Sequence, residues 1–181
     1  MKATGIVRRI DDLGRIVIPK EIRRTLRIRE SDPLEIFTGR EGEIVLKKYS
    51  PIGEMSSFAK QYAESLAQVS GRITLIADRD QFIATAGGGK IFDGKGLSRH
   101  LEDVLDRRET ILAGKGEKQF LEIASDVQDA YEQEMIVPII CEGDVIGAVI
   151  LLETEDKGKM GEVEKKLAQS AAAFLGRQME Q

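Results

Sequence analysis

Residues 5–26 read GIVRRIDDLGRIVIPKEIRRTL, and this pattern predicts two short strands followed by a helix. Strands are expected at residues 4–10 and 15–18, because β-branched residues recur there and residues 11–14 (DDLG) suit the turn between them. Pro19 ends the second strand and also favours the start of a helix at residues 20–26. Gly14 is expected to adopt turn angles that other residues avoid.

The following residues are predicted to form a hairpin. Residues 34–38 and 43–48 alternate apolar and polar side chains, and residues 39–42 (GREG) suit the turn between them. A chain of about fifty residues buries only about 60% of its unfolded surface and is marginal alone. One cysteine and one histidine allow neither a disulfide framework nor a Cys/His zinc site within the chain. We therefore expect this region to form an obligate dimer.

The net charge of -4 hides two regions of opposite sign. Residues 1–50 carry 12 basic and 8 acidic side chains, whereas residues 51–181 carry 15 and 23. This asymmetry predicts two modules with different partners. We place an N-terminal domain at residues 1–50, a linker at residues 51–53, and a second domain at residues 54–181.

The overall composition excludes several classes of protein. With 41% hydrophobic and 32% charged residues, the chain is expected to be neither disordered nor membrane-spanning. The first residues lack the apolar core of a signal peptide, so we expect a cytoplasmic protein with no membrane partner. The absence of Trp and an aromatic content of 5% weaken a single-strand-binding hypothesis.

Basic side chains crowd into residues 8–29, where seven arginines and one lysine occur. One interpretation is a convex surface, doubled in a dimer, that binds the phosphates and groove edges of double-stranded DNA. The alternative is a solvated surface that maintains solubility. Arginine favours the DNA interpretation, because the guanidinium group makes bidentate contacts with phosphates and bases.

The same residues resemble the DNA-binding domain of AbrB-like transition-state regulators. The matching motifs are Gly5-Ile6-Val7-Arg8, DLGRIVIP at residues 12–19, EIRRTL at 21–26, LEI at 34–36 and LKKY at 46–49. The resemblance implies a swapped-hairpin β-barrel, in which two chains interleave their strands. It also implies DNA contacts from the matching arginines, which are Arg8, Arg15, Arg23 and Arg24, with Arg9 as a secondary contact. Recognition through DNA shape and deformability would then accompany base contacts.

The second domain is predicted to be an α+β domain with an antiparallel sheet and flanking helices. The pattern predicts helices at 54–69, 97–107 and 160–179, and strands at 72–77, 81–86, 119–124, 134–141 and 145–153. Residues 48–52 (KYSPI), 146–150 (IGAVI) and the ending from residue 160 resemble AbrB-like regulators of endospore-forming bacteria that carry a C-terminal GAF-like domain.

The first and last helices of this domain carry apolar residues at 4-3 spacing. Packing against the sheet is one interpretation, and a helical bundle between subunits is the other. The residues concerned are Met55, Ala59, Tyr62, Leu66 and Val69 in the first helix, and Leu167, Ala171 and Phe174 in the last. The family resemblance implies a homotetramer built as a dimer of N-terminal dimers.

A candidate ligand loop lies at Gly87, Gly88 and Gly89, since successive backbone N–H groups can hold an anion. The spacing of a phosphate-binding P-loop is missing, so a flexible connection is the alternative. His100 is predicted on a helix surface, Cys141 in the sheet, and loop carboxylates such as Asp78 as solvating charge. No metal, catalytic residue or cofactor is expected, apart from an unidentified small effector in the GAF-like domain.

These patterns favour a DNA-binding protein, and the resemblance implies a transcriptional regulator, both activator and repressor, of sporulation genes. An antitoxin is the alternative, because some antitoxins share the swapped-hairpin domain, but their tails are disordered whereas residues 51–181 are patterned. An enzyme is disfavoured, because no nucleophile-base or metal motif occurs. The resemblance implies a location at the nucleoid, in the forespore of an endospore-forming bacterium.

Overall fold

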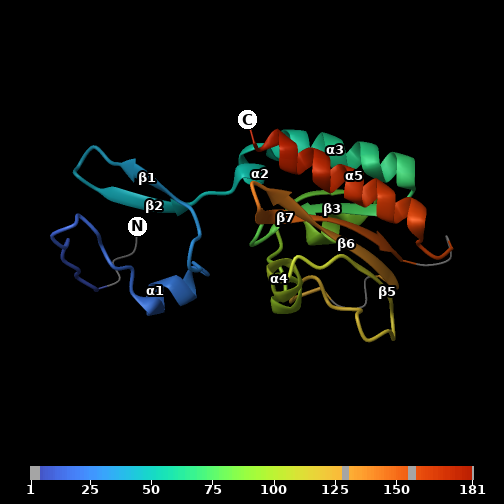
Figure 1. Ribbon diagram of the computed structural model, residues 1–181, viewed down its shortest axis with the longest axis horizontal. Helices are drawn as coiled ribbons and strands as arrows, with labels where there is room; N and C mark the ends of the chain where they lie inside the picture. Colours follow the sequence, from blue (N-terminus) through green and yellow to red (C-terminus); the bar gives the residue numbers. More distant parts are fainter. Residues whose placement is uncertain (1–4, 128–130, 155–157, 181) are drawn as a thin grey trace. The chain divides into compact units, whose positions relative to one another are not determined.

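The computed structural model describes residues 5–127, 131–154 and 158–180 (Figure 1). The chain divides into two compact units, Met1–Tyr49 and Ser50–Gln181, which we name the head and the body. Among the described residues, none of the helices is long and apolar enough to span a lipid bilayer.

The head contains one short helix and one hairpin. Helix α1 (Lys20–Thr25) begins after Pro19, whose ring restricts the backbone to angles compatible with a helix start. Strands β1 (Leu34–Thr38) and β2 (Ile44–Lys48) pair antiparallel along their whole length. The helix and the hairpin confirm the sequence prediction.

The turn at residues 11–14 is held by the side chain of Asp11. Its Oδ1 accepts hydrogen bonds from the backbone N–H of Leu13 at 3.0 Å and of Arg15 at 2.7 Å. Gly14 has a φ of 75°, which confirms the prediction that this position favours glycine.

The two predicted strands on either side of this turn are wrong for the single chain. Residues 5–10 and 15–18 are irregular, and residue 4 lies outside the described residues. A strand needs a neighbour for its backbone hydrogen bonds. In the described head, β1 and β2 form the one sheet and pair with each other. As a result, apolar side chains such as Val7 (90% exposed) and Val17 (69%) face solvent.

The body is built on a five-stranded antiparallel sheet of order β4-β3-β7-β6-β5. Its strands are β3 (Ile73–Ala77), β4 (Phe82–Ala86), β5 (Ile111–Gly114), β6 (Gln133–Cys141) and β7 (Asp144–Glu153). The central hairpin β6–β7 confirms the prediction. Strand β5 pairs with β6 only between Gln133 and Ile136, so the part of β6 that contains Pro138 extends beyond β5.

The strand predicted at residues 119–124 is wrong. These residues are irregular, apart from a single bridge between Leu97 and Ala124, and the neighbouring strand lies at β5 instead. Side chains satisfy the backbone here: Leu121 N donates to Glu134 Oε1 at 2.8 Å, and Ile123 N donates to Tyr131 Oη at 3.1 Å. Such bonds replace the ladder that a strand would need.

Helices cover both faces of the body sheet (Figure 1). Helices α3 (Ser56–Ser70) and α5 (Glu162–Gln178) lie side by side on one face. The other face carries α4 (Arg99–Asp106), a 3₁₀ helix (Gly89–Phe92) and the irregular residues 115–127. Each face has its own apolar core, which gives the α+β layering that the sequence predicted.

The residues predicted to form the linker are helical. Helix α2 (Pro51–Glu54) begins at Ser50, whose Oγ accepts a hydrogen bond from Gly53 N at 3.0 Å. Ser50 Oγ also donates to Asp78 Oδ2 at 3.0 Å, and Ile52 is buried in the core beneath α3. Residues 51–53 therefore pack as part of the body.

Candidate functional site

The arginines predicted to contact DNA all lie on the surface of the head. Arg23 and Arg24 occupy the last turn of α1, where positive charge also opposes the negative end of the helix dipole. Arg8 and Arg9 lie in the irregular segment before the turn, and both are exposed. Arg15 follows the turn with its side chain 68% exposed. The guanidinium groups are thus accessible from solution.

Arg15 already has an acidic neighbour. Its Nε donates to Asp11 Oδ2 at 2.8 Å. The backbone hydrogen bond from Arg15 is the largest influence on Asp11, and together with the guanidinium group it lowers the pKa of that carboxyl. An exposed pair of this kind contributes little stability. An anion that binds this guanidinium group would have to compete with Asp11.

Sequence analysis missed a set of contacts that fixes α1 to the hairpin. Lys48 Nζ donates to the backbone oxygen of Arg27 at 2.7 Å and lies 3.5 Å from Asp32 Oδ2. Arg27, just after α1, has a φ of 50°. The sequence shows a basic residue, Lys48, at the end of β2. Its partner Arg27 lies 21 positions earlier, so only the folded structure reveals the contact.

Three aromatic rings join α3 to α5 on the outer side of the body. Tyr62 stacks on Phe174 with centroids 5.4 Å apart, and Phe58 lies 6.0 Å from Phe174. Phe174 remains 40% exposed. We name Phe58, Tyr62 and Phe174 the aromatic patch. Partly exposed rings of this kind provide apolar area for contact with another surface.

The residues predicted to mediate oligomerisation separate into two sets. One set is buried between the helices and the sheet, and consists of Ala59, Leu66 and Ala171. The other set keeps some exposure, and consists of Met55, Tyr62, Val69, Leu167 and Phe174. The first set packs the body itself. The role of the second set in oligomerisation stays a prediction.

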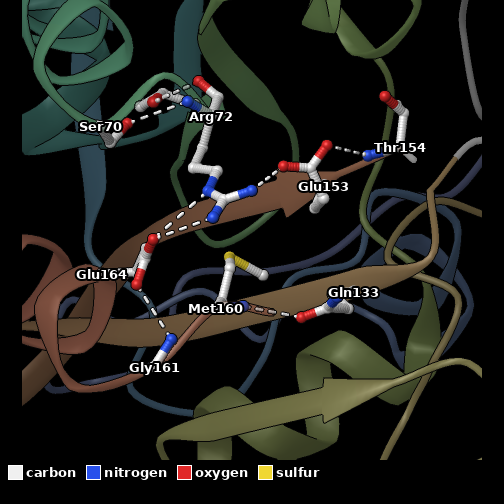
Figure 2. Close-up of polar contacts among 9 residues, drawn as sticks. Ser70, Arg72, Gln133, Glu153, Thr154, Met160, Gly161 and Glu164 are labelled. Atoms are coloured by element: carbon white, nitrogen blue, oxygen red, sulfur yellow. Dashed lines mark hydrogen bonds and ion pairs between the residues drawn. The ribbon is translucent and has the colours of Figure 1, made fainter. Parts of the chain in front are cut away.

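A buried cluster of charges fixes the start of α5 (Figure 2). Arg72 Nη1 pairs with Glu153 Oε2, and Arg72 Nη2 donates to Glu164 Oε1 at 3.0 Å. Glu164 Oε2 accepts from Gly161 N at 2.9 Å, and the Arg72 and Glu153 side chains are 8% and 5% exposed. Burial opposes ionisation of Glu164, but the bonds from Gly161 and Arg72 outweigh it and lower its pKa. One guanidinium group thereby joins β3, β7 and α5.

The candidate ligand loop packs closely against β3. Gly87 and Gly88 have φ values of 68° and 109°. A Cβ on Gly87 would lie 2.6 Å from the backbone oxygen of Arg72, and one on Gly89 would lie 2.6 Å from Leu75 Cδ2. Glycine is therefore required by conformation and by close approach. The ligand contact expected at this loop stays a prediction.

The apolar core beneath α4 contains a buried acidic side chain that sequence analysis missed. Glu134, in β6, is 0% exposed, and burial raises its pKa to about 8. Tyr131 Oη donates to the backbone oxygen of Leu121 at 2.8 Å and accepts from Ile123 N, and burial also raises the pKa of Tyr131. The two side chains hold residues 121–123 over the sheet.

One acidic residue that was expected to be solvating charge is structural instead. Asp78 is 6% exposed, and its Oδ1 accepts from Asp80 N at 2.7 Å and from Gln81 N at 2.8 Å. These bonds shape the turn between β3 and β4, because a carboxylate can satisfy turn N–H groups. His100 lies on the exposed surface of α4 and Cys141 ends β6, as predicted.

Comparisons with known families match both units of the chain. Residues 54–180 match the family described as stage V sporulation protein T C-terminal, transcription factor. Residues 7–54 match the family described as antidote-toxin recognition MazE, bacterial antitoxin. The body is similar to the GAF domain of an Acinetobacter phosphoenolpyruvate-protein phosphotransferase, with a TM-score of 0.57 and 14% identity over 69% of this chain and 81% of that one.

Two curated relatives come from Bacillus subtilis (strain 168). Stage V sporulation protein T is 50% identical over 182 residues, which cover 100% of both proteins. Transition state regulatory protein AbrB is 36% identical over 111 residues, which cover 61% of this chain and 97% of that protein.

An AbrB-like head joined to a GAF-like body defines a two-domain transcriptional regulator, and both predicted domain types are confirmed. The chain belongs to the stage V sporulation protein T family of transcription factors. The antitoxin alternative is not favoured, because the antitoxin match ends at residue 54 and a folded body follows it.

The raised pKa of Glu134 predicts a pH dependence of stability. Its pKa is about 8 in the folded body, against an ordinary value of 4.5, so the folded state holds the extra proton between these values. The contribution of Glu134 to the free energy of unfolding is therefore highest below pH 4.5 and falls as pH rises through about 8. Between pH 6 and pH 9, urea unfolding of Glu134→Gln should lose less stability than wild type. Glu132→Gln, at a more exposed site, should follow wild type. Equal pH slopes for all three proteins would contradict the prediction.

Removing the guanidinium group of Arg72 should destabilise the body. Arg72→Met leaves the carboxylates of Glu153 and Glu164 without their shared cation, and the expected loss is about 3–5 kcal/mol. Lys166→Met, at an exposed position of α5, should change stability by no more than about 0.5 kcal/mol. Urea titration followed by circular dichroism measures both. A second replacement, Glu153→Met, should recover much of the loss in Arg72→Met, and the absence of recovery would show that the charges are not its cause.

Proposed function

We propose that the chain regulates transcription of sporulation genes by binding double-stranded DNA through a dimeric head. The observation that carries this proposal is the surface of the head. Exposed arginines lie there beside apolar side chains that are exposed to solvent in the single chain. The contacts come from Arg8, Arg15, Arg23 and Arg24, with Arg9 as a secondary contact. Depending on the operator, binding activates or represses.

We infer the dimer from the irregular backbone and the exposed apolar side chains of residues 5–10 and 15–18. Val7, Ile10 and Val17 are exposed, and each belongs to a residue type that favours a half-buried strand. Pairing with the same residues of a second chain would give these segments backbone partners and cover their apolar side chains. A swapped-hairpin barrel meets both needs. It also doubles the number of arginines that one DNA duplex meets.

The body then provides assembly. The aromatic patch of one chain can pack against the same patch of another, which gives a self-complementary contact with two-fold symmetry. Two head dimers joined in this way form a tetramer that binds two DNA segments. We place the protein at the nucleoid of the cytoplasm, and in the forespore in view of its family.

The GAF-like body also senses a small effector. GAF-like folds alone do not define a ligand, so this step rests on the apolar core beneath α4, which contains the buried acid Glu134. An enzymatic activity is not proposed, because the family is one of transcription factors.

Removing one proposed DNA contact should weaken binding without unfolding the head. Arg23→Ala should raise the dissociation constant for operator DNA by about 5- to 150-fold, since a phosphate or base contact is worth about 1–3 kcal/mol. Fluorescence anisotropy at fixed salt measures the change. With about four phosphate contacts per head, the log-log salt slope should be about -3 to -4, and less steep by about one in the variant. Arg40→Ala, at the exposed β1–β2 turn, is the matched control. Unchanged affinity in Arg23→Ala would remove Arg23 from the interface.

Removing the exposed ring of the aromatic patch should separate the tetramer into dimers. Phe174→Ser takes apolar area from the contact between bodies while the head dimer stays intact. Analytical ultracentrifugation should show the mass of two chains for this variant and of four for wild type. Val163→Ser, 69% exposed on the same helix, should remain tetrameric. A tetrameric Phe174→Ser protein would exclude the patch as the contact.

A further inference from the structure

The core beneath α4 gathers aromatic rings around one acid. Four of the chain's nine aromatic side chains lie in or against it, and they are Phe82, Phe92, Phe120 and Tyr131. Phe120 and Phe92 lie 5.3 Å and 6.2 Å from Tyr131 between ring centroids. Glu134 reaches the same place from β6, because it accepts from Leu121 N and interacts with Tyr131.

The carboxyl group of Glu134 is only partly satisfied. Oε1 accepts from Leu121 N, whereas Oε2 is buried without a hydrogen-bond partner. Burial, the Leu121 N–H and the Tyr131 hydroxyl act on its pKa, and no cation is among these influences in the described part of the chain. An unsatisfied buried polar atom costs about 1–3 kcal/mol, so a ligand group that donates to Oε2 would recover part of this cost.

We propose that Glu134 is the recognition group of the effector site, and that the effector is a small primary ammonium compound with an apolar body. This inference rests on the proposed function, since it names the effector class for the sensing body. The ammonium group would donate to Glu134 Oε2. The rings of Tyr131, Phe92 and Phe120 would surround it, because aromatic faces attract cations in desolvated sites.

The wall of this site is formed by residues 115–127, which lie outside the strands of the sheet. Residues 115–127 make no strand ladder, and Leu121 and Ile123 are held by the side chains of Glu134 and Tyr131. Further contacts hold the same segment: Ser98 N donates to Ile123 O at 2.9 Å, Leu97 forms a bridge with Ala124, and an exposed ion pair joins Lys95 to Asp126. None of these contacts belongs to the ladder of the five-stranded sheet, so displacement of this segment by a ligand leaves the sheet intact.

The protonation state of Glu134 determines how many protons are released when the ligand binds. Without ligand at pH 7, Glu134 is mostly protonated, since its pKa is about 8. When an ammonium ion binds, the carboxyl releases its proton to solvent and the carboxylate pairs with the cation. Tyr131 and Glu122 are the other titratable groups that act in this region, and neither supplies positive charge. Affinity should therefore rise with pH between 7 and 9.

Calorimetry of the full chain with n-butylammonium tests the proposal. Binding should release about one proton per chain at pH 7, and affinity should rise about tenfold from pH 7 to pH 9. Neutral n-butanol and anionic butyrate should not bind. Glu134→Gln should abolish binding of n-butylammonium, and Glu132→Gln should retain it. If Glu134→Gln does not fold, carbon-13 spectroscopy of wild type should show n-butylammonium lowering the pKa of Glu134 by at least about one unit.

The outcomes separate this inference from the proposed function. No binding of n-butylammonium, equal binding of n-butanol, or an unchanged Glu134 pKa in its presence would each overturn the ammonium site. DNA binding is measured on the same wild-type sample. A sample that binds DNA but not the amine refutes the effector site alone, and a sample that binds the amine but not DNA refutes the proposed function alone.

Discussion

A strand needs a neighbour, and the head of this chain holds strand-forming residues without one. Residues 15–18 and most of residues 5–10 are β-branched or basic, yet they are irregular and expose side chains such as Val7 and Val17. Apolar surface left in water is a driving force for association. The proposed dimer, the doubling of the arginines and the affinity for DNA all depend on this shortage of backbone partners.

In the body, by contrast, the strands are paired in one sheet, and that sheet is covered on both faces. The face under α3 and α5 is apolar throughout its core and is bounded by the Arg72 cluster, which fixes where α5 begins. The face under α4 contains the buried carboxyl group of Glu134 and the irregular residues 115–127. The two faces therefore differ in what covers them, since the two long helices lie over one core and α4 with an irregular segment lies over the other.

Local patterns predicted most of the fold, and long-range contacts account for what they missed. Alternation along residues 134–153 was sufficient for the β6–β7 hairpin, and the 4-3 spacing found both long helices. Residues 119–124 look like a strand, but their N–H groups bond to Glu134 and Tyr131, which no local pattern shows. Arg72 meets Glu153 81 positions away. The arginines of the head were identified through a resemblance, because their charge alone fits a solvated surface equally well.

The end of β6 beyond β5 has a consequence for solubility. A sheet edge with free N–H and C=O groups can recruit strands from other molecules and start aggregation. Pro138 lies in this stretch and has no N–H, so it interrupts the row of donors that an incoming strand would need. This stretch of β6 is thereby a poor template for strand addition.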